Sequence, residues 1–346
     1  MSVSVIVRVP NHLGDCIMAL PMVGETREAH AGSRVTVLVP EPLAELYRDN
    51  PAVDEILTVP REHVHGTIAV FKIRDLIAPR RFDLGYILPP SFGAAAGFKL
   101  GGVKQRIGYI ADGRRLLLTK PLPLPTPLNA THRAETYFNL LRRGAGKELE
   151  FVRPKLFLSE ADTDQADSIL SGFGGSVADR FLVMAVRAVA ESRRWGTANY
   201  LELAKTVIAR HGVKVLLIGT EEDRREAETI AAAAGPGEVI DLCGKTTLRE
   251  AAAILSRATA FVGNDSGPAH LAAAVGIPLV VLSGADDPAE TSPISSRKTV
   301  LRRDELDCIA CVRNTCPLKG EAHMRCMREI SVEEVAAALA PSLAAA

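Results

Sequence analysis

The chain has 346 residues, more than one hydrophobic core usually supports, so its length predicts two domains of roughly 150–180 residues each. Lys and Arg together number 41, as do Asp and Glu, so the formal net charge is zero and a chain-wide basic track for nucleic acid is excluded. The longest apolar stretch, 272–282, is broken by Gly276 and Pro278, and no basic, apolar leader opens the chain. We therefore expect a cytoplasmic protein in at most peripheral contact with the inner face of the membrane.

Short apolar strands alternate with helical segments in the first half of the chain. The run from Val3 to Val7 predicts a buried strand, and apolar residues at helical spacing follow from Asp15 to His30. Further strands are predicted at 35–39, 55–59 and 84–88, with helices around 43–47 and 70–77. This order of elements favours a parallel sheet. Four prolines between Lys120 and Leu128 predict an extended surface loop.

The same order of elements restarts in the second half. Strands are predicted at 181–186, 213–218, 239–242, 260–262 and 279–282, and helices at 200–210, 224–233, 248–255 and 268–275. The predicted fold class is therefore α/β, with two Rossmann-like, doubly wound domains at 1–155 and 156–330 and a C-terminal helix at 331–346. Because such sheets bind ligands beyond the carboxyl ends of their strands, we expect the two domains to face a central cleft.

Asp15 is the candidate catalytic residue. It lies in the segment Asn11-His12-Leu13-Gly14-Asp15, which follows the first strand and opens the first helix. A sugar transfer with inversion needs a base to take the proton of the attacking hydroxyl, and a carboxylate at a strand end suits that task. The alternatives are that Asp15 only caps the helix, or that His12 is the base. His12 is also a candidate acceptor contact.

The second-half segment Gly263–His270 is a candidate anion site. Asp265 or Ser266 can cap the helix that follows, Pro268 suits its first turn, and Gly267 allows a group to approach the backbone. A helix N-terminus of this kind binds phosphate through its amides and its dipole. The alternative is a capped helix without a ligand.

Two further segments follow strands of the second half. Arg193 and Arg194 are placed to neutralise diphosphate oxygens, although an arginine pair is more often solvated surface. Glu221, after the next strand, is a candidate for bonding ribose hydroxyls, although acidic residues are also common in a first helical turn. In the first half, Arg106 and Arg114 are candidates for contacting acceptor phosphates.

Taken in order, these stretches resemble glycosyltransferase family 9, the ADP-heptose:lipopolysaccharide heptosyltransferases. The resemblance covers most of the chain. It rests on Arg8 with Leu13-Gly14-Asp15, on the Arg-Ile-Gly-Tyr segment at 106–109, on Arg193-Arg194-Trp195, on 265–278, and on the Asp-Asp-Pro segment at 286–288. The chain differs from the family at 185–188, where Ala-Val-Arg-Ala replaces Pro-Gly-Ala, and at Arg193, where lysine is usual.

The resemblance implies an inverting enzyme of the GT-B fold, with the acceptor in the N-terminal domain and ADP-heptose in the C-terminal domain. Asp15 takes the position of the family's general base, Arg193 that of its diphosphate-binding lysine, and Asp265 that of its donor-contacting aspartate. Ser266, Gly267, His270 and Glu221 are the further donor candidates. The implied partners are ADP-heptose and a glycolipid acceptor of lipopolysaccharide biosynthesis.

Cys308, Cys311, Cys316 and Cys326 form a cysteine cluster with C-x2-C spacing at its start. Four thiolates can close a tetrahedral structural zinc or iron site. The alternatives are reduced cysteines in a loop or a redox-labile pair. We expect the cluster to take no part in catalysis, and we expect catalysis to require no cofactor.

Three other functions remain open from the sequence. A nucleotide-sugar epimerase of similar fold would use the same donor half without an acceptor pocket. A transferase could use another nucleotide sugar and a different acceptor. A non-catalytic sugar-nucleotide binder would tolerate the loss of Asp15. Fold alone does not decide among them.

Overall fold

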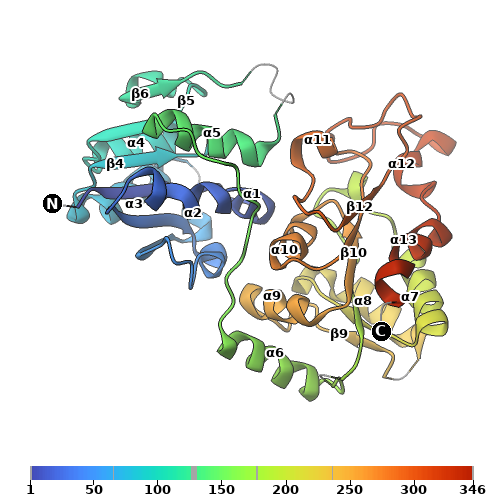
Figure 1. The fold of residues 1–346 in the computed structure, drawn as a ribbon. Helices are drawn as coiled ribbons and strands as arrows, with labels where there is room; N and C mark the ends of the chain where they lie inside the picture. Colours follow the sequence, from blue (N-terminus) through green and yellow to red (C-terminus); the bar gives the residue numbers. More distant parts are fainter. Residues whose placement is uncertain (1, 65, 126–130, 177, 236, 345–346) are drawn as a thin grey trace. The chain divides into compact units, whose positions relative to one another are not determined.

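The computed structural model describes residues 2–64, 66–125, 131–176, 178–235 and 237–344. The chain divides into two compact units, Met1–Phe157 and Leu158–Ala346 (Figure 1). The division lies next to the predicted boundary at 155, and the C-terminal helix belongs to the second unit. The cleft expected between the two units stays a prediction.

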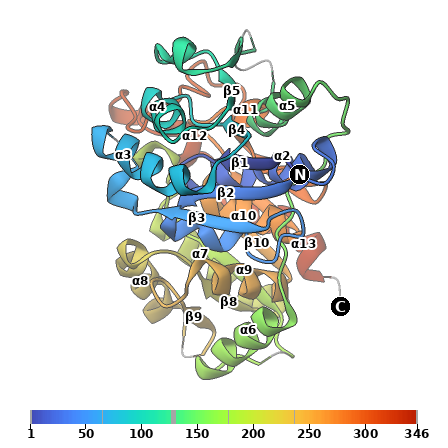
Figure 2. The same ribbon diagram turned by 90° about the vertical axis from the view of Figure 1, so that its left-hand side faces the viewer.

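The first unit holds a six-stranded sheet in the order β3-β2-β1-β4-β5-β6, and every neighbouring pair is parallel. Its strands are β1 (Ser4–Arg8), β2 (Arg34–Pro40), β3 (Glu55–Val59), β4 (Leu84–Ile87), β5 (Gln105–Tyr109) and β6 (Lys120–Leu122). Its helices are α1 (Leu13–Met18), α2 (Leu20–Ala29), α3 (Gly66–Ile77), α4 (Phe92–Leu100) and α5 (Arg133–Ala145). Helices α3 and α4 pack side by side, as both views show (Figures 1 and 2).

The second unit repeats this arrangement. Its strand order is β12-β11-β10-β7-β8-β9, again parallel throughout. The strands are β7 (Phe181–Ala185), β8 (Lys214–Leu217), β9 (Val239–Asp241), β10 (Ala260–Asn264), β11 (Leu279–Leu282) and β12 (Lys298–Leu301). The helices are α6 (Glu160–Gly172), α7 (Thr197–His211), α8 (Arg224–Ala234), α9 (Leu248–Arg257), α10 (Gly267–Val275), α11 (Pro288–Thr291), α12 (Arg325–Arg328) and α13 (Val332–Ala344).

Counted within its unit, each sheet has the order 3-2-1-4-5-6, so the prediction of two doubly wound α/β domains is confirmed. The central strands β7 and β10 are buried along their whole length, because helices cover both faces of a parallel sheet. The C-terminal helix α13 packs on α7 and places Val335, Leu339 and Leu343 in the core of the second unit (Figure 1). Among the described residues, no helix has both the length and the apolar character that crossing a membrane demands.

The prediction of a loop over 120–128 was partly wrong. Residues 120–122 form β6, which pairs only with β5 at the edge of the sheet. Pro121 fits there because a proline lacks an N–H group, and an edge strand needs partners on one side only. The rest of that segment includes 126–130, which lie outside the described residues. The strands β5 and β12 and the helices α4, α5, α6, α11 and α12 were not predicted either.

Candidate active site

The principal candidate residues lie at the carboxyl ends of strands at the switch point of each sheet. In both sheets the first strand lies between the second and the fourth, so chain connections leave it in opposite directions. Asp15 follows β1, Arg193 follows β7, and Asp265 directly follows β10. The structure thus places these residues where open parallel sheets bind ligands.

Asp15 lies in the first turn of α1, and its carboxylate is bound from helix α5. Its Oδ1 accepts a hydrogen bond from the hydroxyl of Tyr137 at 3.2 Å and lies 3.4 Å from Nη1 of Arg133. His12 is the N-cap residue, immediately before the helix, and its side chain makes no capping hydrogen bond. The alternative that Asp15 serves as the helix cap is therefore wrong. Burial, together with the neighbouring carboxylate of Asp15, raises the pKa of Tyr137, so this tyrosine stays a hydrogen-bond donor.

Arg8 holds the segment that presents Asp15. Its guanidinium is buried, donates to Asn11 Oδ1 at 2.5 Å, and also contacts the backbone carbonyls of Val9 and Leu38. Burial lowers the pKa of Arg8 to about 10, which leaves the side chain charged at neutral pH. Arg8 therefore stabilises the turn between β1 and α1.

In the second unit, Arg193 forms an ion pair that the sequence does not reveal. Its Nη2 lies 2.6 Å from Oδ1 of Asp286, a nearly buried carboxylate in the segment after β11. One third of the Arg193 side chain remains exposed, so the guanidinium can still reach a ligand. Trp195 anchors the segment that carries Arg193, because its indole is buried and donates to the carbonyl of Ile330 at 2.7 Å.

Asp265 lies beside this ion pair and is only 4% exposed. Its Oδ2 accepts a hydrogen bond from the hydroxyl of Ser283 at 3.2 Å. Burial, followed by the neighbouring carboxylate of Asp286, raises the pKa of Asp265 to about 7. Burial lowers the pKa of Lys298, a cation on β12 whose charge favours the ionised form of Asp265. The four charged groups form a compact cluster of two carboxyls and two cations.

Helix α10 begins directly after Asp265. Ser266 occupies the residue before the helix, but its hydroxyl donates to the carbonyl of Asn264 at 3.1 Å and makes no capping hydrogen bond. Gly267 and Pro268 form the first turn, as predicted. The start of α10 therefore lacks a side-chain cap, which suits the binding of an anion. His270 is buried within the helix.

Glu221 lies in the short 3-10 helix that follows β8, at the same edge of the sheet. Its carboxylate is 65% exposed and pairs with Nη1 of Arg224 at 2.5 Å. Gly244 approaches it closely: a Cβ there would lie 2.3 Å from Oε2 of Glu221, and the backbone φ of +71° also favours glycine. The predicted ribose contact is thus placed at a strand end, and its role stays a prediction.

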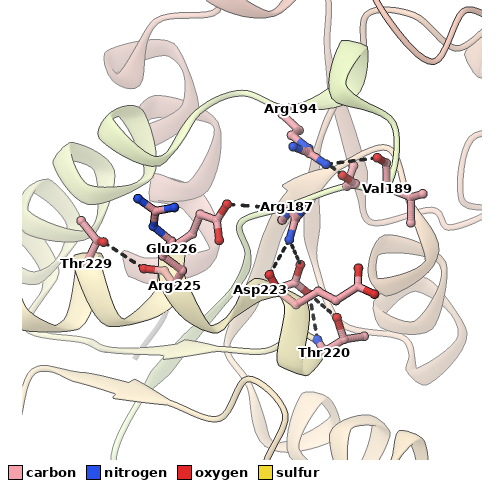
Figure 3. A network of polar contacts seen from close by, with 10 residues as sticks. Arg187, Val189, Arg194, Thr220, Asp223, Arg225, Glu226 and Thr229 are labelled. Atoms are coloured by element: carbon pink, nitrogen blue, oxygen red, sulfur yellow. Dashed lines mark hydrogen bonds and ion pairs between the residues drawn. The ribbon is translucent and has the colours of Figure 1, made fainter.

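The loop that differs from the family pattern is held by a network of arginines (Figure 3). Arg187 contacts the carboxylates of Asp223 and Glu226, each at 3.9 Å, and the backbone of the same turn. Arg194 donates to the carbonyls of Ala188 at 2.8 Å and Val189 at 3.1 Å. Of the predicted arginine pair, Arg194 therefore shapes its own loop, and Arg193 alone belongs to the charged cluster.

The predicted acceptor contacts differ in their exposure to solvent. His12 is exposed beside Asp15, as an acceptor contact requires. Arg114 is fully buried and donates to the carbonyls of Tyr109, Pro89 and Ile87. Its guanidinium satisfies buried backbone groups, so the interpretation of Arg114 as a phosphate contact was wrong.

Arg106 is likewise engaged by its own unit. Its guanidinium donates to the carbonyls of Leu117 at 2.7 Å and Val103 at 2.5 Å. The side chain holds the segment after β5 against the end of α4. The basic group nearest to the Asp15 carboxylate is instead Arg133, which the sequence analysis did not single out.

The cysteine cluster lies beside the end of β11. A Cβ on Gly284 would come within 2.8 Å of Sγ of Cys326, so glycine leaves room for the thiol. Burial, followed by the neighbouring thiols of Cys308, Cys311 and Cys316, raises the pKa of Cys326 to about 11. Within the described ranges, no three His, Cys, Asp or Glu side chains converge as metal ligands.

Two Rossmann-like units with this strand order, one with a carboxylate at its switch point and the other with a cluster of charged groups, are the architecture of the GT-B class of glycosyltransferases. The sequence model of glycosyltransferase family 9 (heptosyltransferase) matches residues 70–322. The chain belongs to this family, and the predicted resemblance is confirmed. It is a glycosyltransferase, and the epimerase alternative is not favoured.

Individual relatives agree with the family. The chain is 27% identical over 304 residues to lipopolysaccharide heptosyltransferase 2 of Escherichia coli K12, with 85% of this chain and 86% of the relative covered. The solved structure of E. coli ADP-heptose lipopolysaccharide heptosyltransferase II is similar, with a TM-score of 0.82, 25% identity and 99% of each chain covered. TibC of enterotoxigenic E. coli, described as an iron-containing dodecameric glycosyltransferase, shares the fold at 16% identity, with a TM-score of 0.62 and 99% and 77% coverage.

Proposed function

We propose that this protein transfers a heptose from ADP-heptose to a hydroxyl group of the lipopolysaccharide inner core, with inversion at the anomeric carbon. The observation that carries the proposal is the Arg193 guanidinium at the switch point of the second unit, beside the uncapped start of α10. The names of the E. coli relatives support ADP-heptose as donor and lipopolysaccharide as acceptor.

The second unit binds the donor. Arg193 and the first amides of α10 take the diphosphate oxygens, and they stabilise the charge that grows on the leaving nucleoside diphosphate. Asp265 forms hydrogen bonds with hydroxyl groups of the sugar. The hydroxyl of Ser283 donates to its buried carboxyl and orients it. Glu221 bonds the ribose.

The first unit supplies the base. Tyr137 and Arg133 both contact Oδ1 of Asp15, so their hydrogen bonds orient the carboxylate. Oδ2 is then the oxygen that receives the proton as the acceptor hydroxyl attacks the anomeric carbon. The exposed imidazole of His12 contacts the acceptor.

A thermal-shift screen tests the donor assignment. We expect ADP-heptose to raise the melting temperature more than matched UDP- and GDP-sugars at equal concentration, because a ligand selective for the native state stabilises it by mass action. ADP-glucose is the control that separates recognition of the adenine nucleotide from recognition of heptose. Greater protection by a UDP- or GDP-sugar would contradict the donor assignment. Product analysis with and without acceptor then distinguishes a transferase from a sugar-nucleotide binder.

We also propose that Cys308, Cys311, Cys316 and Cys326 hold a structural zinc or iron ion. Thiolate sulfurs suit both metals, and the iron of TibC supports the idea. Binding requires the side chains to draw together and lose their protons. We expect about one equivalent of metal per chain in protein purified without chelator, and a large loss of that metal in Cys326→Ser. Elemental analysis that finds equally little metal in both proteins would contradict this proposal.

A further inference from the structure

The Arg193–Asp286 ion pair presents a charge problem for a site that binds a diphosphate. A nearly buried carboxylate lies 2.6 Å from the cation that receives the anion, and a second carboxyl, Asp265, lies beside it. Two ionised carboxylates would repel the ligand that Arg193 attracts. Arg193 and Lys298 balance the charge of the two carboxylates, so a proton on one carboxyl gives the cluster a net positive charge, which favours binding of an anion.

One further segment, residues 310–314, forms hydrogen bonds with the backbone next to each partner of the ion pair. The N–H of Ser192, the residue before Arg193, donates to the carbonyl of Asn314 at 3.1 Å. The N–H of Val312 donates to the carbonyl of Ala285, the residue before Asp286, at 2.7 Å. These hydrogen bonds restrain the backbone next to both partners, so the fold itself positions the ion pair.

We propose that Asp286 is a positioning residue for the donor: it orients the Arg193 guanidinium and, together with Asp265, forms a carboxyl pair that holds one proton while the diphosphate is bound. This inference rests on the proposed function of the second unit. Asp286 binds Nη2 of Arg193 and thereby fixes the direction in which the guanidinium points.

The charges around Asp265 determine the direction of the pH effect. Asp286 from the segment after β11 favours the protonated carboxyl, while Arg193 after β7 and Lys298 on β12 favour the ionised one. Helix α10, which begins two residues after Asp265, carries the buried His270. The pKa of Asp265 is already about 7, and a bound diphosphate raises it further, because negative charge opposes ionisation.

Above neutral pH, Asp265 therefore takes up a proton when the donor binds. The affinity for the nucleotide sugar falls as the pH rises above neutrality. Removing the charge of Asp286 removes the main carboxylate that favours protonation of Asp265, so the pH-dependent range moves to lower pH. The measured quantity is the pH dependence of the Kd for the nucleotide sugar. If Asp286 had a purely structural role, its removal would leave this pH dependence unchanged.

The test is calorimetric titration of ADP-heptose, whose diphosphate does not titrate near neutrality, into wild type and Asp286→Asn between pH 6.5 and 8.5. We expect the wild-type Kd to rise at least about threefold over this range, approaching tenfold per pH unit in the limit of one proton taken up. We expect Asp286→Asn to bind more weakly at pH 6.5 and to show a smaller rise of Kd over this range than wild type, because burial still raises the pKa of Asp265. Asp286→Glu, which keeps the charge, should restore the slope.

Asp287→Asn is the matched control, because it removes the same charge from the neighbouring residue, which caps α11 through Ala289. It should keep the wild-type slope. Equal pH dependence in wild type and Asp286→Asn would overturn the inference and leave the proposed function intact. Wild type that binds no ADP-heptose at any pH would overturn the proposed function, and this inference with it.

Discussion

Asp15→Asn should lower kcat for heptose transfer by about 100- to 10,000-fold, the range that general-base catalysis typically contributes. The amide keeps the shape of the side chain and can still accept hydrogen bonds from Tyr137 and Arg133, but it cannot take the acceptor proton. Donor binding should be unchanged, because Arg193 and Asp265 belong to the other unit. Steady-state kinetics and the thermal shift with ADP-heptose measure the two effects separately.

Two control variants make this result specific. Tyr137→Phe removes one hydrogen bond to Oδ1 and leaves the carboxylate, so we expect a loss of only about tenfold or less. His12→Ala tests the alternative base, because its imidazole is exposed at the start of α1. If Asp15→Asn turns over within about threefold of wild type while His12→Ala does not, the assignment of the base is wrong and passes to His12.

Asp162→Ala should lower the free energy of unfolding of the second unit by about 3–5 kcal/mol, which is typical when one partner of a buried ion pair is removed. Asp162 lies 2.5 Å from Nη2 of Arg249, and these side chains are 8% and 3% exposed. The same carboxylate accepts hydrogen bonds from the backbone N–H and the hydroxyl of Ser159 at the start of α6. The variant therefore leaves a buried arginine without this carboxylate and removes the Asp162 half of the capping box of α6.

Urea unfolding followed by tryptophan fluorescence measures this loss, because Trp195 is the single tryptophan and lies buried in the second unit. The matched control is Asp167→Ala, which breaks a more exposed ion pair with Arg257 and should cost about 1 kcal/mol or less. Similar losses in both variants would contradict the argument from burial.

The pH dependence of the Asp162 effect has a definite sign. Arg249 and Ser159 hold the pKa of Asp162 well below its usual value of 3.8. The stabilisation is therefore fully present above pH 3.8 and is lost as pH falls through the lower, folded-state pKa. The difference between wild type and Asp162→Ala should be constant near neutral pH and shrink in acid.

The sequence predicted most accurately those strands that have a neighbouring strand on each side. Strand β11 was predicted with its observed bounds, because a strand inside a parallel sheet is apolar along its length. Helix α5 was missed although its buried residues Ala134, Phe138 and Leu141 lie at helical spacing, and β6 was missed because its proline argues against a central strand. Helix α6 did carry a local signal, the capping box of Ser159 and Asp162.

The sequence alone made Asp15, Arg193 and Asp265 candidates, and the structure places each of them after a strand, at the edge where parallel sheets bind ligands. Only the tertiary structure decided what surrounds them: Arg133 and Tyr137 reach Asp15 from more than a hundred residues away, and Asp286 reaches Arg193 from another strand end. It also decided that Arg114 is buried against carbonyls. The physical reason is that strand and helix patterns are local, whereas the charge, burial and pKa of a side chain depend on groups that only folding brings near.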